Sequence, residues 1–281
     1  GKGATAPTSM QLNLFQWDLV EVGNGYRRLA ALDFEQAQAH FLRVLTALPN
    51  HQAAEAGLQA ASYWQDTFAT LPTLEGEKGV AYLWQRLRGF SFGCSANDNE
   101  LRTNLLRQSQ AVMEGAALEY LPPDLCRGSV SLQLGDYENA EQQLRRLIES
   151  FPEDGLLYGY LADALWMQKR RELANSLYAL ALLLAPELMA DHAVRNQRLA
   201  ALITDHGAAL APVYGYLGGV VPLVEQEFAA ATEAASIYAL LRQVERARYR
   251  RDHAAMITAR KQFRELAPEV FSAYLQFVQA L

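Results

Sequence analysis

Apolar residues recur at intervals of three and four positions along most of the 281-residue chain. This spacing is typical of amphipathic helices, and the strict alternation expected of strands is rare. Proline and glycine interrupt the pattern where helices should end. The pattern predicts helices over about 18–31, 33–48, 51–70, 77–90, 100–117, 233–250, 253–267 and 269–280. We therefore expect an all-α fold, with a mobile loop at 93–99 and a kinked helix or buried connector within 205–225.

Small and large residues also repeat with an offset of 34 positions. Gly128, Ala140, Leu144, Leu147 and Pro152 return as Ala162, Ala174, Tyr178, Ala181 and Pro186, and the same internal spacing occurs at Gly25, Ala37, Phe41, Val44 and Pro49. A period of about 34 residues is typical of helical repeat arrays. These positions resemble those of the tetratricopeptide repeat family, whose helix pairs stack into a superhelix.

The resemblance implies a single right-handed α-solenoid of tetratricopeptide-like helix pairs over residues 11–281. The clear repeats would be 18–51, 121–154 and 155–188, with degenerate repeats at 52–120 and 189–270 and a C-terminal cap at 269–281. Residues 1–10 would be a flexible tail or a remnant of expression. Within each clear pair, the small residues let the helices cross closely, and the prolines end the second helix.

In this family the first helix of each pair lines a concave groove that binds other chains. By spacing, the groove residues here would be Tyr26, Leu29, Leu125, Leu132, Gln133, Asp163, Trp166 and Met167. Aromatic residues and methionine are typical of peptide-binding surfaces. The alternative interpretation is that several of these residues are core positions between stacked repeats. The resemblance therefore implies a non-enzymatic scaffold for a protein or peptide partner.

A short motif near the N-terminus supports a second hypothesis. Gln11, Leu12, Leu14 and Phe15 resemble the pentapeptide by which bacterial replication and repair proteins bind the β sliding clamp. Such a replication or repair accessory would require an accessible N-terminal segment. The competing interpretation is a buried helix face, because Leu12, Phe15, Leu19 and Val22 also follow helical spacing.

Charge narrows the range of partners. The chain has 25 Lys and Arg residues against 31 Asp and Glu residues, a net charge of −6. This balance argues against general affinity for nucleic acid. One local basic patch lies within 242–264, where Arg242, Arg246 and Arg250 share a helix face. Either a solvated helix surface or a site for an acidic partner would account for it.

A third hypothesis is an α-helical enzyme with its site near 92–100 or 205–225. The sequence contains no phosphate-binding loop and no nucleophile elbow. Three Asp-His neighbours, at 191–192, 205–206 and 252–253, lack metal-ligand spacing. We therefore expect no cofactor and no metal. Cys94 and Cys126 fit reduced thiols in a cytoplasmic protein, and no run of 18 apolar residues could cross a membrane. The sequence does not determine the oligomeric state.

Overall fold

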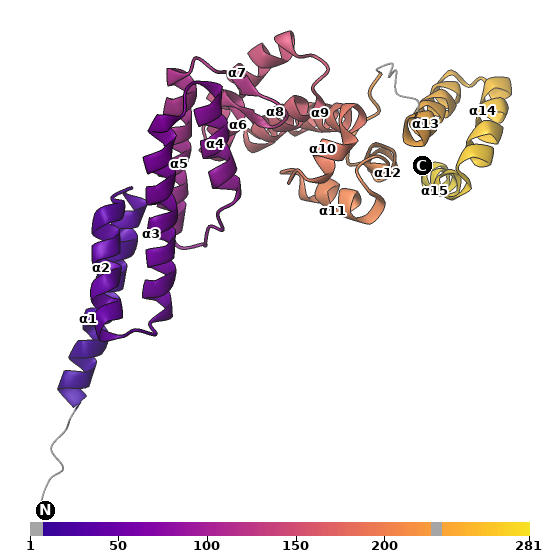
Figure 1. The fold of residues 1–281 in the computed structure, drawn as a ribbon. Helices are drawn as coiled ribbons and strands as arrows, with labels where there is room; N and C mark the ends of the chain where they lie inside the picture. The colour runs from indigo at the N-terminus through magenta and orange to yellow at the C-terminus, as the bar shows by residue number, and fades with distance from the viewer. Residues whose placement is uncertain (1–7, 226–231) are drawn as a thin grey trace, which may run out of the picture. The chain divides into compact units, whose positions relative to one another are not determined.

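The computed structural model describes residues 8–225 and 232–281, with side chains from residue 16 onward, and is almost entirely helical (Figure 1). Helices account for 76% of it and strands for 2%, which confirms the predicted all-α class. The chain divides into two compact units, Gly1–Leu121 and Pro122–Leu281.

The first unit is built around a pair of helices joined by a tight turn. Its elements are α1 (Thr8–Ala30), α2 (Phe34–Ala47), α3 (Gln52–Thr70), the 3₁₀ turn η1 (Leu71–Thr73), α4 (Glu77–Arg88), α5 (Ala96–Gly115) and β1 (Tyr120–Leu121). Helix α3 packs against both α1 and α2, and α5 packs against α1 and α4. The three helices of the first 70 residues therefore share one apolar core with α4 and α5.

The second unit contains two further pairs of the same kind and a C-terminal helical group. Its elements are β2 (Leu125–Cys126), α6 (Arg127–Gln133), α7 (Tyr137–Ser150), α8 (Gly155–Met167), α9 (Arg171–Leu184), α10 (Pro186–Ala190), α11 (Gln197–His206), α12 (Ala211–Leu217), α13 (Glu233–Arg250), α14 (His253–Leu266) and α15 (Pro268–Gln279). Helix α7 packs against both α6 and α8, and α8 packs against α9. Helix α12 contacts α9, α13 and α15.

The predicted division into small and large positions is present in the packing of the helix pairs. A methyl group added at Gly25 would lie 2.5 Å from Cε1 of Phe41, and one added at Gly57 would lie 2.3 Å from its Cζ. In the pair α6–α7, a methyl group at Gly128 would lie 2.4 Å from Cγ of Leu144. Side chains do not tolerate such distances, so glycine is what lets these helices approach so closely.

The helix ends follow the predicted capping and proline positions. The Asp33 carboxylate accepts a hydrogen bond from the backbone N–H of Gln36 (3.3 Å) and caps α2. Asp136 caps α7 in the same way. Helix α2 ends at Ala47, two residues before Pro49, and α7 and α9 end two residues before Pro152 and Pro186. Each proline therefore follows directly after the cap of the second helix, where it removes no helical hydrogen bond.

Three predicted segments differ from the structure. The first helix, expected over 18–31, begins at Thr8 and so includes the end of the expected tail 1–10. The segment 121–126 is predicted to open a helix, but the first helix of that pair begins only at Arg127, after a cis Pro122–Pro123 peptide bond and the short strand β2. The predicted loop 93–99 is also shorter than expected, because α5 begins at Ala96.

The start of α5 shows why the loop is short. Ser95 Oγ accepts a hydrogen bond from the backbone N–H of Asp98 (3.1 Å), and the Asp98 carboxylate accepts one from the N–H of Ser95 (3.1 Å). This reciprocal capping box starts the helix in the middle of the polar run. Just before the loop, the rings of Phe90 and Phe92 pack on Trp64, with centroids 5.1 and 6.4 Å away. Apolar residues therefore anchor the segment from its N-terminal side.

Candidate functional site

Four of the eight predicted groove residues are buried. The exposed fractions are 2% for Leu29, 1% for Leu125, 4% for Leu132 and 1% for Asp163. Leu29 belongs to the core of the first unit, and Leu125 lies in strand β2 rather than on a helix face. These four positions are packing residues, as in the alternative interpretation, and do not form a surface for a partner.

Tyr26 has a structural role of its own. Its ring packs edge-on against Phe41, with centroids 5.0 Å apart, and its hydroxyl donates a hydrogen bond to the carbonyl of Ala53 (2.7 Å). Burial, reinforced by the negative charge of Asp98, raises the pKa of Tyr26. The side chain therefore joins α1 to the start of α3 and is only partly accessible.

The other three predicted residues remain accessible to different degrees. Gln133 is exposed, and Met167 is 38% exposed. Trp166 is half-buried, and the guanidinium of Arg171 lies 4.9 Å above its ring. Trp166 and Met167 therefore form a small accessible apolar surface at the C-terminal end of α8.

Asp163 is the centre of a buried polar network. Its carboxylate accepts hydrogen bonds from the hydroxyl of Tyr178, from Nε2 of His192 (2.6 Å) and from the backbone N–H of Arg195 (3.0 Å). Burial and the adjacent Asp163 charge raise the pKa of the Tyr178 phenol. The network fastens the segment after α10 to the pair α8–α9, so its role is structural.

The Asp-His neighbours in the sequence do not predict these pairings. His192 binds Asp163, which lies 29 residues earlier, rather than its neighbour Asp191. His51 similarly binds Asp18 across a separation of 33 residues (2.9 Å). A search for acid-histidine pairs about one repeat apart would have found both. Among the residues that the structure describes, no group of three or more His, Cys, Asp and Glu side chains could hold a metal ion.

The C-terminal pair α13–α14 has the cap and proline spacing of the clear repeats but a different buried face. Asp252 caps α14 and Pro268 follows it by sixteen residues, as in the pairs that end at Pro49, Pro152 and Pro186. In α2 and α7, the buried positions are the fourth, eighth and eleventh after the cap. In α14 they are the seventh and eleventh, Ala259 and Phe263. The eleventh position is therefore buried in all three helices, whereas the fourth and eighth positions of α14, Met256 and Arg260, are only partly buried.

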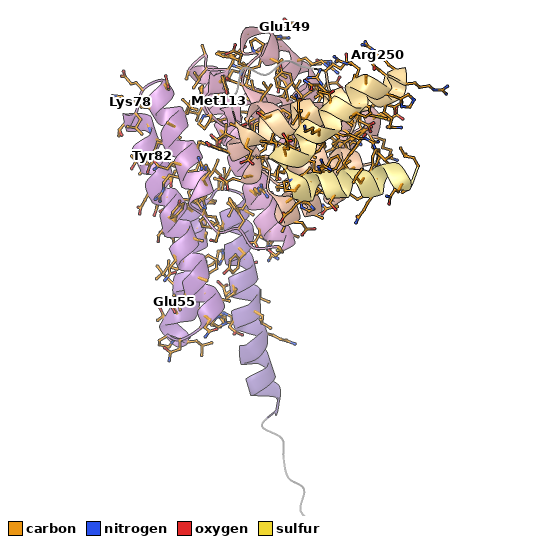
Figure 2. The ribbon with its side chains drawn as sticks, turned by 90° about the vertical axis from the view of Figure 1, so that its right-hand side faces the viewer. Glu55, Lys78, Tyr82, Met113, Glu149 and Arg250 are labelled. Atoms are coloured by element: carbon orange, nitrogen blue, oxygen red, sulfur yellow. The ribbon has the colours of Figure 1, made fainter. Side chains whose placement is uncertain are left out.

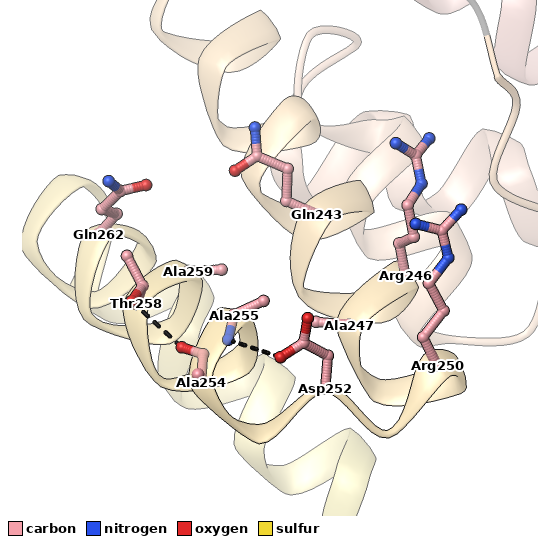
Figure 3. A pocket seen from close by; sticks show the side chains of 10 residues that line it. All are labelled: Gln243, Arg246, Ala247, Arg250, Asp252, Ala254, Ala255, Thr258, Ala259 and Gln262. Carbon is pink, nitrogen blue, oxygen red and sulfur yellow. Dashed lines mark hydrogen bonds between the residues drawn. The ribbon is translucent and has the colours of Figure 1, made fainter.

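A groove with a volume of about 510 Å³ lies between α13 and α14 (Figure 3). Its lining residues are Gln243, Arg246, Ala247 and Arg250 from α13, the cap residue Asp252, and Ala254, Ala255, Thr258, Ala259 and Gln262 from α14. Four of the ten are alanines. The floor is therefore made largely of methyl groups, with longer polar side chains around it.

Some polar groups around the groove are bonded within α14, and others are available to a ligand. The Asp252 carboxylate accepts a hydrogen bond from the N–H of Ala255 (3.1 Å), and the Thr258 hydroxyl donates one to the carbonyl of Ala254 (3.1 Å), so both serve α14 itself. Figure 3 shows Arg246 and Arg250 side by side along α13, at one wall of the groove. The groups offered to a ligand are therefore mainly hydrogen-bond donors with positive charge.

The two arginines have few internal partners. The Arg246 guanidinium lies 3.9 Å from the carboxylate of Glu225, whose side chain is 81% exposed. Arg250 makes no ion pair within the described ranges, and Figure 2 shows its side chain projecting into solvent. Both arginines also line a second depression of about 350 Å³, which includes Tyr249. They therefore stand on a ridge between two hollows.

The acidic residue nearest to this ridge along α13 is already neutralised. Glu245 is 1% exposed and accepts hydrogen bonds from the Tyr216 hydroxyl (2.6 Å) and from the guanidinium of Arg248. Burial and the bonded Glu245 carboxylate raise the pKa of Tyr216, because both disfavour the phenolate. Glu245 is thus committed to the core between α12 and α13 and does not offset the charge of Arg246 and Arg250.

A third cavity, of about 400 Å³, includes part of the segment where an enzyme site was expected. It is lined by Leu182, Leu183, Pro186, Glu187, Ala190, Gly207, Ala208, Ala209, Thr232, Ala234 and Ala235. Glu187 is the one titratable group in this lining. A single carboxylate among apolar side chains does not form the converging set of groups that acid-base catalysis requires.

Two further predicted features lie outside these cavities. Gln11 to Phe15 lie within helix α1, and their side chains are outside the described residues. Cys94 is exposed, whereas Cys126 is buried and caps α6; burial raises the pKa of its thiol.

Over the described ranges, none of the helices combines the length and apolar character needed to cross a bilayer. Comparison of the chain with protein-family models, curated proteins and solved structures gives no match.

Proposed function

We propose that this chain is a helical-repeat scaffold that binds a segment of another protein, and that the groove between α13 and α14 is its binding site. The observation that carries the proposal is the open groove of about 510 Å³ on a pair of helices whose inner face is fully packed. A concave surface with an apolar floor and a polar rim is the usual form of a protein-binding groove.

The proposal includes membership of the tetratricopeptide class and a solenoid arrangement of the pairs. Its support is the 34-residue offset and the close contact of a small residue with a large one, seen for Gly25 with Phe41 and for Gly128 with Leu144. Scaffolds of this class bind through surfaces that their stacked pairs leave uncovered. In this chain the uncovered surface belongs to α13–α14, because α8–α9 packs against α6, α7, α10 and α12.

Catalysis is the less favoured function. The two depressions beside Arg246 and Arg250 contain no histidine or cysteine. Their carboxylates are Asp252, which caps α14, Glu245, which is buried and bonded to Tyr216 and Arg248, and Glu225, which lies 3.9 Å from Arg246. Arginine remains protonated in proteins and cannot exchange a proton during a reaction. A surface of this composition is suited to holding a partner by charge and shape.

Site-specific photo-cross-linking tests the proposal. A photoreactive phenylalanine analogue placed at Gln262 would face the groove, whereas one placed at Ile257, which is 68% exposed, is the matched control on the same helix. We expect a cross-linked partner from Gln262 and none from Ile257. The partner is identified by mass spectrometry, purified, and titrated by calorimetry against the full chain.

A variant that fills the groove tests whether the cross-linked partner binds there. Ala255→Trp places an indole in the groove and should abolish binding of the purified partner, whereas Ile257→Trp should leave its Kd unchanged. Equal cross-linking at the two positions, or unchanged affinity in Ala255→Trp, would contradict the proposed site.

A further inference from the structure

We infer that the partner segment is an acidic helix that presents carboxylates four residues apart to Arg246 and Arg250. This inference rests on the proposed function and specifies the chemistry of the partner. Its basis is the charge, spacing and shape of the groove, each of which restricts what can bind there.

The charge of α13–α14 is opposite to that of the rest of the chain. Residues 233–266 contain eight Lys and Arg against four Asp and Glu, a net charge of +4, while the whole chain has a net charge of −6. Glu245 is buried and paired with Arg248, so it does not offset Arg246 and Arg250. In the groove lining itself, these two arginines face one carboxylate, that of the cap residue Asp252, which leaves a local charge of +1. A carboxylate that enters the groove therefore meets a local positive potential.

The spacing of the two guanidinium groups matches that of a helix. Arg246 and Arg250 are one turn apart on α13, which separates them by about 6 Å along the helix axis. A partner helix aligned with α13 repeats its side chains at the same interval, so Asp or Glu at positions i and i+4 can meet both arginines. Arginine forms bidentate hydrogen bonds with carboxylates, which adds orientation to the charge attraction.

The floor of the groove favours a helix of small residues. Ala247, Ala254, Ala255 and Ala259 present only methyl groups, so a partner backbone can approach closely. The α13 side of the groove runs from Gln243 to Arg250, about 10 Å or two helical turns. A short amphipathic helix fits this length, with alanine or another small residue on the face that touches the floor.

Two other occupants fit less well. A nucleic acid needs a series of phosphate contacts along its backbone, whereas only two arginines line this alanine-floored groove. A second copy of this chain lacks the required motif, because no described helix carries two carboxylates four residues apart. The observations therefore favour an acidic helix from a different protein.

The test is fluorescence anisotropy with a labelled alanine-rich helical peptide of about 20 residues, the length at which such helices form in water. The peptide carries Glu at positions i and i+4, and the matched peptide carries Gln instead. We expect the Glu peptide to bind the full chain and the Gln peptide to bind at least tenfold more weakly. The affinity for the Glu peptide should also fall as salt is added.

Protein variants locate the binding. Arg246→Gln/Arg250→Gln should weaken binding of the Glu peptide about tenfold, because each charge-assisted pair contributes a factor of a few. Lys261→Gln/Arg264→Gln removes the same charge from α14 outside the groove lining and should change the affinity less than twofold. Circular dichroism of each variant confirms that its helices are intact.

Several outcomes would overturn the inference. Equal binding of the Glu and Gln peptides, or equal loss in the two double variants, removes the assigned role of Arg246 and Arg250. Tighter binding of a single-stranded DNA oligomer, or self-association that the arginine variant abolishes, identifies a different occupant. If Gln262 cross-links to a partner but the Glu peptide does not bind, the inference fails and the proposed function stands. If Gln262 yields no partner, the proposed function fails independently.

Discussion

The pairs α8–α9 and α13–α14 have the same spacing between cap and proline but use their surfaces in opposite ways. Helix α8 buries ten of its thirteen residues, from Gly155 to Leu165. Helix α13 buries six of its eighteen, and its outer side carries arginines. A helix that is packed on most sides leaves little surface for a partner, whereas an amphipathic helix at an uncovered position leaves more.

This difference shows that repeat spacing alone does not identify a binding surface. The spacing places Asp163 and Trp166 on the first helix of their pair, but α7, α9 and α10 pack around α8 and cover most of it. In α14 the buried positions shift to Ala259 and Phe263, and the small residues Ala254 and Ala255 face the groove instead. The same residue type is structural in one pair and available to a ligand in the other.

The largest expected effect is on the free energy of unfolding, and it should differ between a tyrosine of α8–α9 and a tyrosine of α13–α14. Tyr178 is fully buried, and Tyr178→Ala should lower the free energy of unfolding by about 3–5 kcal/mol through the cavity it leaves. Tyr249 of α13 is 75% exposed, and Tyr249→Ala should change the free energy by less than about 0.5 kcal/mol. Urea denaturation and hydrogen exchange of the α9 amides measure the free energy of unfolding of the two variants. Similar losses in the two variants would contradict the contrast.

A smaller loss of stability is expected when small residues are enlarged. The loss should be greater for a residue that faces a neighbouring helix than for one that faces open space. Gly128→Ala forces a methyl group against Leu144 and should cost about 1–3 kcal/mol. Ala255→Leu adds a larger side chain in the groove and should cost less than about 0.5 kcal/mol. Gly115→Ala is the control, since nothing lies within 4 Å of the added methyl group. Thermal denaturation ranks the three, and a large loss in Ala255→Leu would show that the groove is packed in solution.

A third prediction concerns the dependence of stability on pH in the two regions. Burial alone would raise the pKa of the Glu141 carboxyl, but hydrogen bonds from Arg145, Gln168 and Arg170 outweigh it and hold the pKa below its usual value of 4.5. A lowered pKa in the folded protein contributes stability at neutral pH that is lost as pH falls through that pKa. Glu141→Gln should therefore cost about 1 kcal/mol at neutral pH.

The difference between wild type and Glu141→Gln should shrink as the pH falls below about 4. Glu225→Gln is the matched control from the C-terminal region, because Glu225 is 81% exposed and 3.9 Å from its arginine, so its substitution should change the free energy of unfolding by less than about 0.5 kcal/mol at neutral pH. Urea midpoints measured across this pH range test both variants. A difference for Glu141→Gln that stays constant with pH would contradict the assigned role of the carboxylate.

Local signals predicted much of the fold. Periodicity and capping residues located helices such as α3 and α14 within two residues of their bounds, and the small-large spacing predicted the contact of Gly25 with Phe41. The strands near residue 121 were missed, because Pro122 and Pro123 interrupt a pattern that otherwise continues the repeat. The long-range pairing of Asp163 with His192 was missed, because nothing local links the two residues.

The candidate site was only partly predicted. The sequence showed the basic stripe of Arg242, Arg246 and Arg250 but gave no reason to prefer it over the groove residues of α8. Which face of a helix pair is covered depends on what packs beside it, and that is decided by tertiary contacts. The different packing of α14 could have been noticed from Met256 and Arg260, which occupy positions where the clear repeats have alanine and a large apolar residue.

The smallest expected effect concerns the two accessible residues of α8. Trp166 is half-buried beneath the Arg171 guanidinium, and Met167 is 38% exposed, so both could still contact a partner. If α13–α14 holds the partner, Trp166→Ala should change its Kd less than twofold, whereas Arg246→Gln/Arg250→Gln should weaken it about tenfold. Calorimetry with the partner cross-linked from Gln262 compares the two variants. A larger loss in Trp166→Ala, with an unchanged circular dichroism spectrum, would return the binding surface to α8 and reverse the contrast between the two pairs.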